Sequence, residues 1–164
     1  MPRRAARLVI IDPDGAVYLQ LHDDAEISLH WAPPGGGLEE GENEVEAAVR
    51  ETAEETGWTD VKLGPALCTW EHDYTREGVP VRQSETLFVA EGPRRDLEGD
   101  LTESHRVDGI LAVRWWTPGA LAESRALFWP PSLPELVARV RREGPPAEPL
   151  ELGYVANVDR LHVD

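Results

Sequence analysis

The chain has 164 residues, and its 16 basic and 31 acidic side chains give a formal net charge of −15 at neutral pH. This length predicts one domain over residues 1–164, large enough to bury a core without disulfide bonds. The hydrophobic fraction of 41% argues against a wholly disordered chain. So negative a chain is expected to bind neither nucleic acid polymers nor anionic membranes, because both need clustered Lys and Arg.

The N-terminal pattern and the cysteine content favour a cytoplasmic protein. The apolar run Leu8–Ile11 is too short for the hydrophobic region of a secretory signal, and no segment approaches the roughly 20 apolar residues of a membrane span. The single cysteine, Cys68, cannot form an intrachain disulfide, which favours a reducing compartment. Its apolar neighbours predict a small buried side chain rather than a catalytic thiol.

The first forty residues predict a hairpin followed by a glycine-rich segment. Leu8–Ile11 and Val17–Leu21 are expected to be strands, because Asp12–Gly15 between them is a strong turn signal. Two prolines and three glycines then form Pro33–Gly37. Consecutive glycines indicate either a tight bend with a close backbone approach or simply a flexible loop.

Residues 43–56 predict a helix. Asn43 and Glu46 have the spacing of a capping box, and Gly57 fits the helix end. Apolar or small residues recur at helical spacing and predict one modestly apolar face, formed by Val45, Ala48, Val49 and Thr52.

The second half of the chain predicts further strands and a terminal helix. Strands are expected over residues 61–70, 84–90 and 110–116, with a turn at 76–78 and an acidic loop over 91–105. Ser132 and Glu135 are expected to form a capping box for a helix with the apolar stripe Leu133, Leu136, Val137 and Val140. Residues 143–164 form a Pro-containing extension, whose part after 149 is either a strand or a mobile tail. The order of elements indicates an α/β fold with a mixed sheet covered by helices.

Nearly half of the net charge lies in one segment. Residues 39–55 hold eight acids and one base, Arg50, so their net charge is −7. Glu51, Glu54 and Glu55 share an arc of roughly 100° on the predicted helix, where like charges repel. A divalent cation such as Mg²⁺, which prefers oxygen ligands, would relieve this repulsion. The alternative is a solvated acidic face, on which Arg50 and Glu54 form an ordinary surface ion pair.

The same segment carries a known pattern. Gly36 is followed by five residues, Glu42, seven residues and then Arg50–Trp58. This spacing resembles the Nudix box, G-x5-E-x7-R-E-U-x-E-E-x-G-U, with every fixed Gly, Glu and Arg present. Trp31–Gly37 also resembles the family's approach to the box. Two packing positions depart from the pattern, since Thr52 and Trp58 stand where the family prefers aliphatic residues.

The resemblance implies a Nudix-type α/β/α sandwich with a mixed β-sheet. It also implies a metal-dependent hydrolase that cleaves a phosphoanhydride bond in a nucleoside diphosphate linked to another moiety. A dinucleoside polyphosphate, an ADP-ribose-type conjugate and a nucleoside triphosphate all stay open as the nucleotide substrate. The alternative is a non-catalytic, nucleotide-binding or regulatory module. Family members often pair, so a homodimer also stays open.

The resemblance further implies roles for residues of the box. Carried over by position, Glu51, Glu54 and Glu55 would bind Mg²⁺ or Mn²⁺, with the Gly35 carbonyl as an additional ligand. Arg50, four residues before Glu54, is placed to orient that side chain by a charge-assisted hydrogen bond. A carboxylate must also take a proton from the attacking water. Glu54 is the first candidate for this base, Glu103 is the second, and Glu98 is a third; for the last two the alternative is a solvated loop acid.

Aromatic residues outside the box are the candidates for substrate binding. Trp70, His72 and Tyr74 alternate along one strand, so they share a face that either stacks a nucleobase or packs in the core. Tyr74 lies sixteen residues after Trp58, which resembles the dinucleoside polyphosphate hydrolases of the family. Trp31 is a further candidate, as are Phe128 and Trp129, although the last two more readily anchor the terminal helix.

Overall fold

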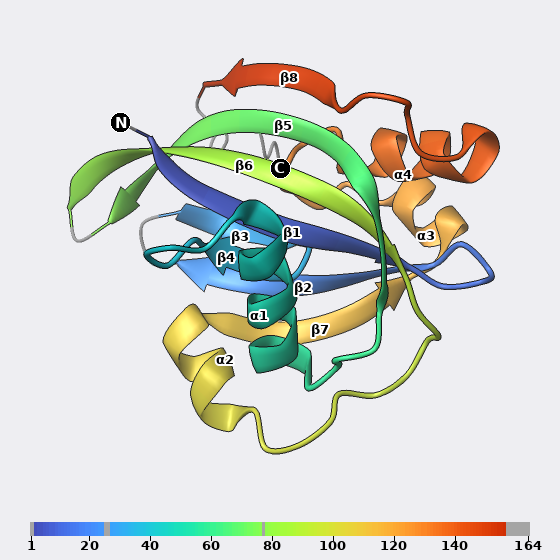
Figure 1. The fold of residues 1–164 in the computed structure, drawn as a ribbon, viewed down its shortest axis with the longest axis horizontal. Helices are drawn as coiled ribbons and strands as arrows, with labels where there is room; N and C mark the ends of the chain where they lie inside the picture. Colours follow the sequence, from blue (N-terminus) through green and yellow to red (C-terminus); the bar gives the residue numbers. More distant parts are fainter. Residues whose placement is uncertain (1, 25–26, 77, 157–164) are drawn as a thin grey trace.

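A mixed β-sheet runs through the molecule in the computed structural model, which describes residues 2–24, 27–76 and 78–156 (Figure 1). The hydrogen-bonded order is β3-β2-β1-β6-β5-β8, with β4 paired to β1 and β7 to β2. The pairs β1·β6 and β5·β8 are parallel and the others antiparallel. The strands are β1 (Arg3–Ile11), β2 (Val17–Asp24), β3 (Ile27–Ala32), β4 (Gly35–Gly37), β5 (Lys62–Arg76), β6 (Val79–Glu91), β7 (Ile110–Trp116) and β8 (Leu150–Val155).

Helices cover both faces of this sheet, which confirms the predicted α/β/α sandwich. Side chains alternate along β1, so Val9 packs into a cluster with Leu133 and Val137, whereas Leu8 packs with Ala47 and other residues on the opposite face. In Figure 1, α1 crosses in front of the sheet, and α3 and α4 lie to its right. The helices are α1 (Glu44–Thr56), α2 (Thr102–Asp108), α3 (Pro118–Glu123) and α4 (Leu133–Glu143).

Helix α1 begins and ends as the sequence predicts. The Asn43 side chain accepts a hydrogen bond from the Glu46 backbone, and the Glu46 side chain accepts one from the Asn43 backbone. Gly57 closes the helix in the left-handed conformation, with φ 79°. The predicted apolar face is wrong in part, because Val49 is exposed while Glu55 is buried. The buried side instead contains small residues that let α1 approach β1 and β4 closely, namely Ala47, Ala48, Thr52 and Thr56.

Several elements differ from the sequence-based expectation. The glycine segment is a strand, since Gly35–Gly37 pairs with β1, and β1 begins at Arg3 rather than at Leu8. The expected acidic loop ends in helix α2, because a turn of helix forms before Gly109, whose φ is 70°. The capping box expected at Ser132 is wrong: its backbone, with φ −84° and ψ 8°, is not in the extended conformation usual for an N-cap, and its side chain makes no capping hydrogen bond.

The C-terminal part of the described chain adds a strand to the sheet edge. After the Pro-containing break, β8 pairs in parallel with β5, which confirms the strand alternative for residues 150–155. Residues 157–164 of the predicted extension lie outside the described residues. Cys68 is buried as predicted, and burial raises the pKa of its thiol to about 12. Among the described residues, no helix combines the length and apolar character that crossing a membrane requires.

Candidate functional site

Three carboxylates from two helices meet at one end of α1. Glu51 and Glu55, one helical turn apart, are joined by Asp108 at the end of α2, and one oxygen of each lies within 4.8 Å of the others. Glu55 is buried, Glu51 is half-buried and Asp108 is exposed. Sequence reasoning missed Asp108, although the αL glycine that follows it, Gly109, is a signal for the end of a helix.

The glycines of β4 allow the backbone to reach this cluster. The Gly35 backbone N–H donates a 3.0 Å hydrogen bond to Oε1 of Glu55. A Cβ atom at Gly36 would lie 2.8 Å from the Glu51 carboxyl carbon, so a side chain there would displace the carboxylate. The close approach predicted for the glycine segment is therefore present. It brings Gly35 beside the cluster, while the role of its carbonyl as a metal ligand stays a prediction.

Burial and nearby negative charge raise the pKa of two of these carboxylates, Glu51 and Glu55. Burial, followed by the charges of Glu51 and Asp108, raises the pKa of Glu55 well above its usual range. Burial also raises the pKa of Glu51, against the opposing charge of Arg50. The converging carboxylates offer hard oxygen donors, and among them Glu51 also accepts a hydrogen bond from Arg50. The donor set therefore fits Mg²⁺ or Mn²⁺.

Arg50 holds the acidic residues of the box in place. Its Nε and Nη2 donate to the two carboxylate oxygens of Glu42 at 2.7 and 3.0 Å, and Nη2 also donates to the Gly37 carbonyl at 3.1 Å. Its Nη1 donates to Glu51 at 3.1 Å and to Glu54 at 3.3 Å. The hydrogen bonds to Glu42 are the largest cause of the raised pKa of Arg50. Arg50 thus links β4 to three glutamates, which is more than an isolated surface pair.

The structure brings together only part of the predicted ligand set. Glu54 does not belong to the group of Glu51, Glu55 and Asp108, and its side chain is 52% exposed beside Arg50. Both of its carboxylate oxygens accept hydrogen bonds from Arg50, at 3.4 and 3.3 Å, and its role as the base stays a prediction. Among the described residues, the three-carboxylate group therefore contains two of the three predicted glutamates and one residue from outside the box.

A hollow of about 420 Å³ adjoins the carboxylates, a size within the usual range of small-ligand sites. Tyr74 lines it, and its role in substrate binding stays a prediction. Trp31 and Glu103 are not among its described lining residues. Trp31 instead packs edge-on against Trp116, with ring centroids 5.1 Å apart. Glu103 is exposed and bonded to Arg106. The described lining residues include Arg3, Arg7, His22, His30, Gly35, Gly36, Gly37, Glu51, Glu55, Tyr74, Gln83, Asp108 and Trp129.

The predicted aromatic face divides into a packed part and an accessible part. Trp70 and His72 are buried, and their rings stack with centroids 4.3 Å apart. Trp129 packs against His72 from the loop before α4, at 4.7 Å between centroids. Tyr74 is half-buried, and its hydroxyl accepts a 3.1 Å hydrogen bond from Arg3. The packing interpretation therefore applies to Trp70 and His72, while Tyr74 faces the hollow.

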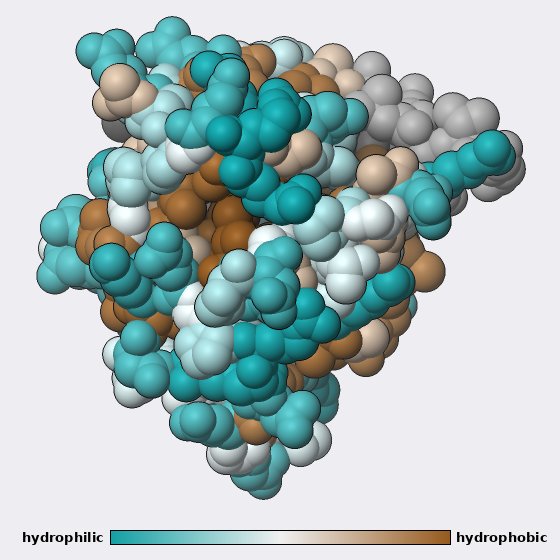
Figure 2. Space-filling view, turned by 90° about the vertical axis from the view of Figure 1, so that its right-hand side faces the viewer, coloured by the Kyte–Doolittle hydropathy of each residue, from teal (hydrophilic) through white to brown (hydrophobic). Residues whose placement is uncertain are grey.

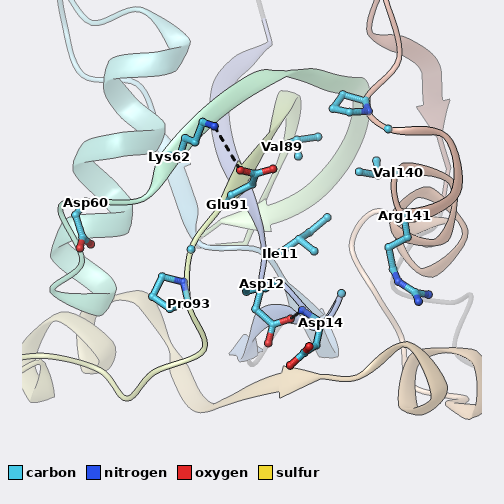
Figure 3. A pocket seen from close by; sticks show the side chains of 15 residues that line it. Ile11, Asp12, Asp14, Asp60, Lys62, Val89, Glu91, Pro93, Val140 and Arg141 are labelled. Atoms are coloured by element: carbon cyan, nitrogen blue, oxygen red, sulfur yellow. Dashed lines mark hydrogen bonds and ion pairs between the residues drawn. The ribbon is translucent and has the colours of Figure 1, made fainter.

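A second hollow of about 920 Å³ lies between the β1–β2 turn and α4 (Figure 3). Ile11, Val89 and Val140 line it together with charged residues such as Arg141. Figure 2, which views the molecule from that side, shows brown apolar surface in a depression rimmed by hydrophilic residues. The three-carboxylate group found among the described residues lines the hollow of about 420 Å³. We therefore take that hollow as the candidate functional site.

Comparisons with known proteins show what this chain is similar to. A family model for the NUDIX domain matches residues 1–139. The RNA pyrophosphohydrolase of Bartonella quintana is 39% identical over 74 residues, which cover 42% of this chain and 43% of that protein. The asymmetrical bis(5′-nucleosyl)-tetraphosphatase of Mus musculus is 61% identical over 28 residues, or 17% of this chain and 19% of that protein. The chain spans less than half the length of the curated relatives it matches.

Solved structures show the same fold. The C. elegans Ap4A hydrolase in a binary complex superposes with a TM-score of 0.59 at 21% identity, covering 85% of this chain and 96% of that chain. The E. coli dihydroneopterin triphosphate pyrophosphohydrolase gives a TM-score of 0.60 at 23% identity, with the same coverage. At these identities the likeness concerns the fold alone. Gly36, Glu51 and Glu55 of the box line the candidate site. Because the family model matches residues 1–139, the chain belongs to the Nudix family.

Proposed function

We propose that this protein is a metal-dependent hydrolase of phosphoanhydride bonds in nucleotides, with Mg²⁺ or Mn²⁺ held by Glu51, Glu55 and Asp108. The convergence of these three carboxylates, one of them buried, carries the proposal. The carbonyl of Gly35, the residue whose N–H contacts Glu55, is proposed as a further ligand. A bound divalent cation would neutralise phosphate charge and acidify a bound water.

The residues of the chain supply the remaining requirements of the reaction. Arg50 keeps Glu42 and Glu51 in fixed positions through its hydrogen bonds. Glu54, exposed beside them, is proposed to accept the proton of the attacking water. The water oxygen then bonds to phosphorus as the bridging P–O bond of the anhydride breaks and the second phosphate leaves. Tyr74 and the other residues of the hollow are proposed to contact the substrate.

The substrate class can be found with a panel assay. The full chain is expected to hydrolyse at least one of diadenosine tetraphosphate, ADP-ribose, a nucleoside triphosphate and a short RNA with a 5′-triphosphate. Activity is expected with Mg²⁺ and none with EDTA. Tyr74, at the spacing of the dinucleoside polyphosphate hydrolases, favours the first. Products separated by anion-exchange chromatography identify the bond cleaved. Absence of turnover on the whole panel, together with no Mg²⁺ binding by calorimetry, would support the non-catalytic alternative.

The identity of the base can be tested with two matched variants. Glu54→Gln is expected to lower kcat by about a hundredfold or more, since the amide cannot accept the proton. Glu103→Gln is expected to keep nearly normal kcat, because Glu103 is exposed and bonded to Arg106 on α2. Both variants should bind Mg²⁺ as the unmodified protein does. The opposite pattern of kcat values would transfer the role to Glu103.

A further inference from the structure

A buried polar network lies beneath the wall of the candidate site. Glu85 on β6 is almost completely buried and accepts three hydrogen bonds. Arg7 Nε on β1 donates at 2.6 Å, Gln83 donates its side-chain amide at 2.8 Å, and His72 Nε2 on β5 lies at 2.7 Å. Arg7 also donates from Nη1 to the Pro33 carbonyl at 3.0 Å. Two edges of the Arg7 guanidinium are thus held, one by a buried carboxylate of β6 and one by a backbone carbonyl between β3 and β4.

Arg7 lines the same hollow as the carboxylates of Glu51, Glu55 and Asp108. Its side chain is 11% exposed, and it lines the hollow together with Glu51 and Glu55. Burial by itself would lower the pKa of Arg7. The negative charge of Glu85, followed by those of Glu55 and Glu51, outweighs this effect, so the pKa of Arg7 is raised. Its Nη2 makes no hydrogen bond to any residue within 2–24, 27–76 and 78–156. A fixed guanidinium therefore presents an unused donor to the hollow.

A second guanidinium reaches the same wall. Arg3 donates from Nη1 to the Gln83 side chain at 2.8 Å and to the Tyr74 hydroxyl at 3.1 Å. It also lies over the glycine strand, where a Cβ atom on Gly37 would stand 2.3 Å from its Nη2. Gln83 joins this arginine to Glu85 and so to Arg7. The two arginines belong to one hydrogen-bonded unit beside the carboxylates.

A fixed cation beside a cation site weakens metal binding unless an anion lies between the two positive charges. We propose that Arg7, with Arg3 beside it, forms an anion subsite that binds a phosphate group of the substrate. The proposal rests on the proposed function, because it assumes that the substrate carries linked phosphates. One phosphate would meet the metal held by Glu51, Glu55 and Asp108, and a neighbouring phosphate would meet Arg7. The site would accordingly select di- and polyphosphates over phosphate monoesters.

The subsite can be tested by binding rather than by turnover. The probe is methylenediphosphonate, a diphosphate analogue whose P–C–P bridge resists hydrolysis, titrated by calorimetry in the presence of Mg²⁺. Arg7→Met alone leaves Glu85 buried without its partner, so the double variant Arg7→Met/Glu85→Gln keeps the region neutral. The affinity of the double variant for the probe is expected to fall roughly 10- to 100-fold, the usual cost of losing hydrogen bonds to a charged group. Arg141→Gln, an exposed arginine at the second hollow, serves as the matched control and should bind normally.

Binding of Mg²⁺ without the probe separates the subsite from general damage. The double variant is expected to bind Mg²⁺ as tightly as the unmodified protein, or more tightly, because a cation has left the hollow. Unchanged probe affinity in a folded double variant would overturn the proposal, and so would absence of probe binding by the unmodified protein. If the unmodified protein binds the probe through Arg7 yet hydrolyses no nucleotide, the subsite stands and the proposed function fails.

Discussion

Replacing Glu55 with Gln is expected to lower kcat by about a thousandfold, the scale on which fixed electrostatic groups act in active sites. Glu55 is buried at the centre of the carboxylate cluster, and an amide supplies neither its charge nor an equivalent ligand. Calorimetry should show weaker Mg²⁺ binding together with the lost activity. Glu40→Gln, an exposed acid of the same segment, is the control and should retain both. Normal activity of Glu55→Gln would exclude Glu55 from the proposed metal site.

Glu55→Gln is expected to lower activity but to make the metal-free protein more resistant to high pH. The fold raises the pKa of Glu55, so it favours the protonated form, and this stabilisation is lost as pH rises through the raised pKa. In EDTA, Tm is therefore expected to fall as pH rises above the usual glutamate range. The Tm of Glu55→Gln should fall less over the same pH range, because the Gln side chain still accepts the Gly35 hydrogen bond and carries no charge. Mg²⁺ should restore Tm of the unmodified protein at high pH by binding the folded state. A Tm in EDTA that does not depend on pH would contradict this account.

Trp58→Ala is expected to cause the largest loss of stability, about 3–5 kcal/mol, as for other buried aromatic truncations. Trp58 is 1% exposed, and its ring meets Tyr18 edge-on with centroids 4.7 Å apart. Its Nε1 donates to the Asp96 carbonyl at 3.1 Å, which anchors the loop that leads to α2. Truncation removes both the packing and this anchor. Urea denaturation measures the loss of the free energy of unfolding.

Two further variants make the Trp58 result specific. Trp58→Phe should lose less stability than Trp58→Ala, since it keeps a ring and gives up only part of the contact and the hydrogen bond. Val79→Ala, at an exposed position of β6, should change the free energy of unfolding by about 0.5 kcal/mol or less. Equal losses of the free energy of unfolding for Trp58→Ala and Val79→Ala would show that the packing of Trp58 against Tyr18 contributes little to stability.

The predictions that succeeded depend on local spacing. The capping box of Asn43 and Glu46 and the C-cap at Gly57 need only neighbouring residues, and the helical period places Glu51 and Glu55 on one face. The glycine segment indicated a close approach because a side chain has no room there. These features lie within one helix and the short strand before it, so the sequence contains their geometry.

The features that were missed depend on distant pairing. Asp108 reaches the cluster only because residues 92–101 bring α2 back across the end of α1. Glu54 and Glu55 are adjacent in the sequence, and only tertiary packing decides that Glu55 turns inward. Arg7 and Glu85 are 78 residues apart and meet through the parallel pairing of β1 with β6. A charged residue inside an apolar strand was the available signal for this pair.

The alternation of side chains along β1 links the packing of the two cores to the position of Arg7 at the candidate site. Val9 and Leu8 belong to the cores on opposite faces, and Arg7 faces the same way as Val9. If β1 paired with β6 one residue out of register, the two cores would exchange their apolar residues and Arg7 would turn away from Glu85. A misregistered chain would therefore lose core packing and the arginine of the hollow together. Stable but inactive conformers that differ only at this strand are for that reason disfavoured.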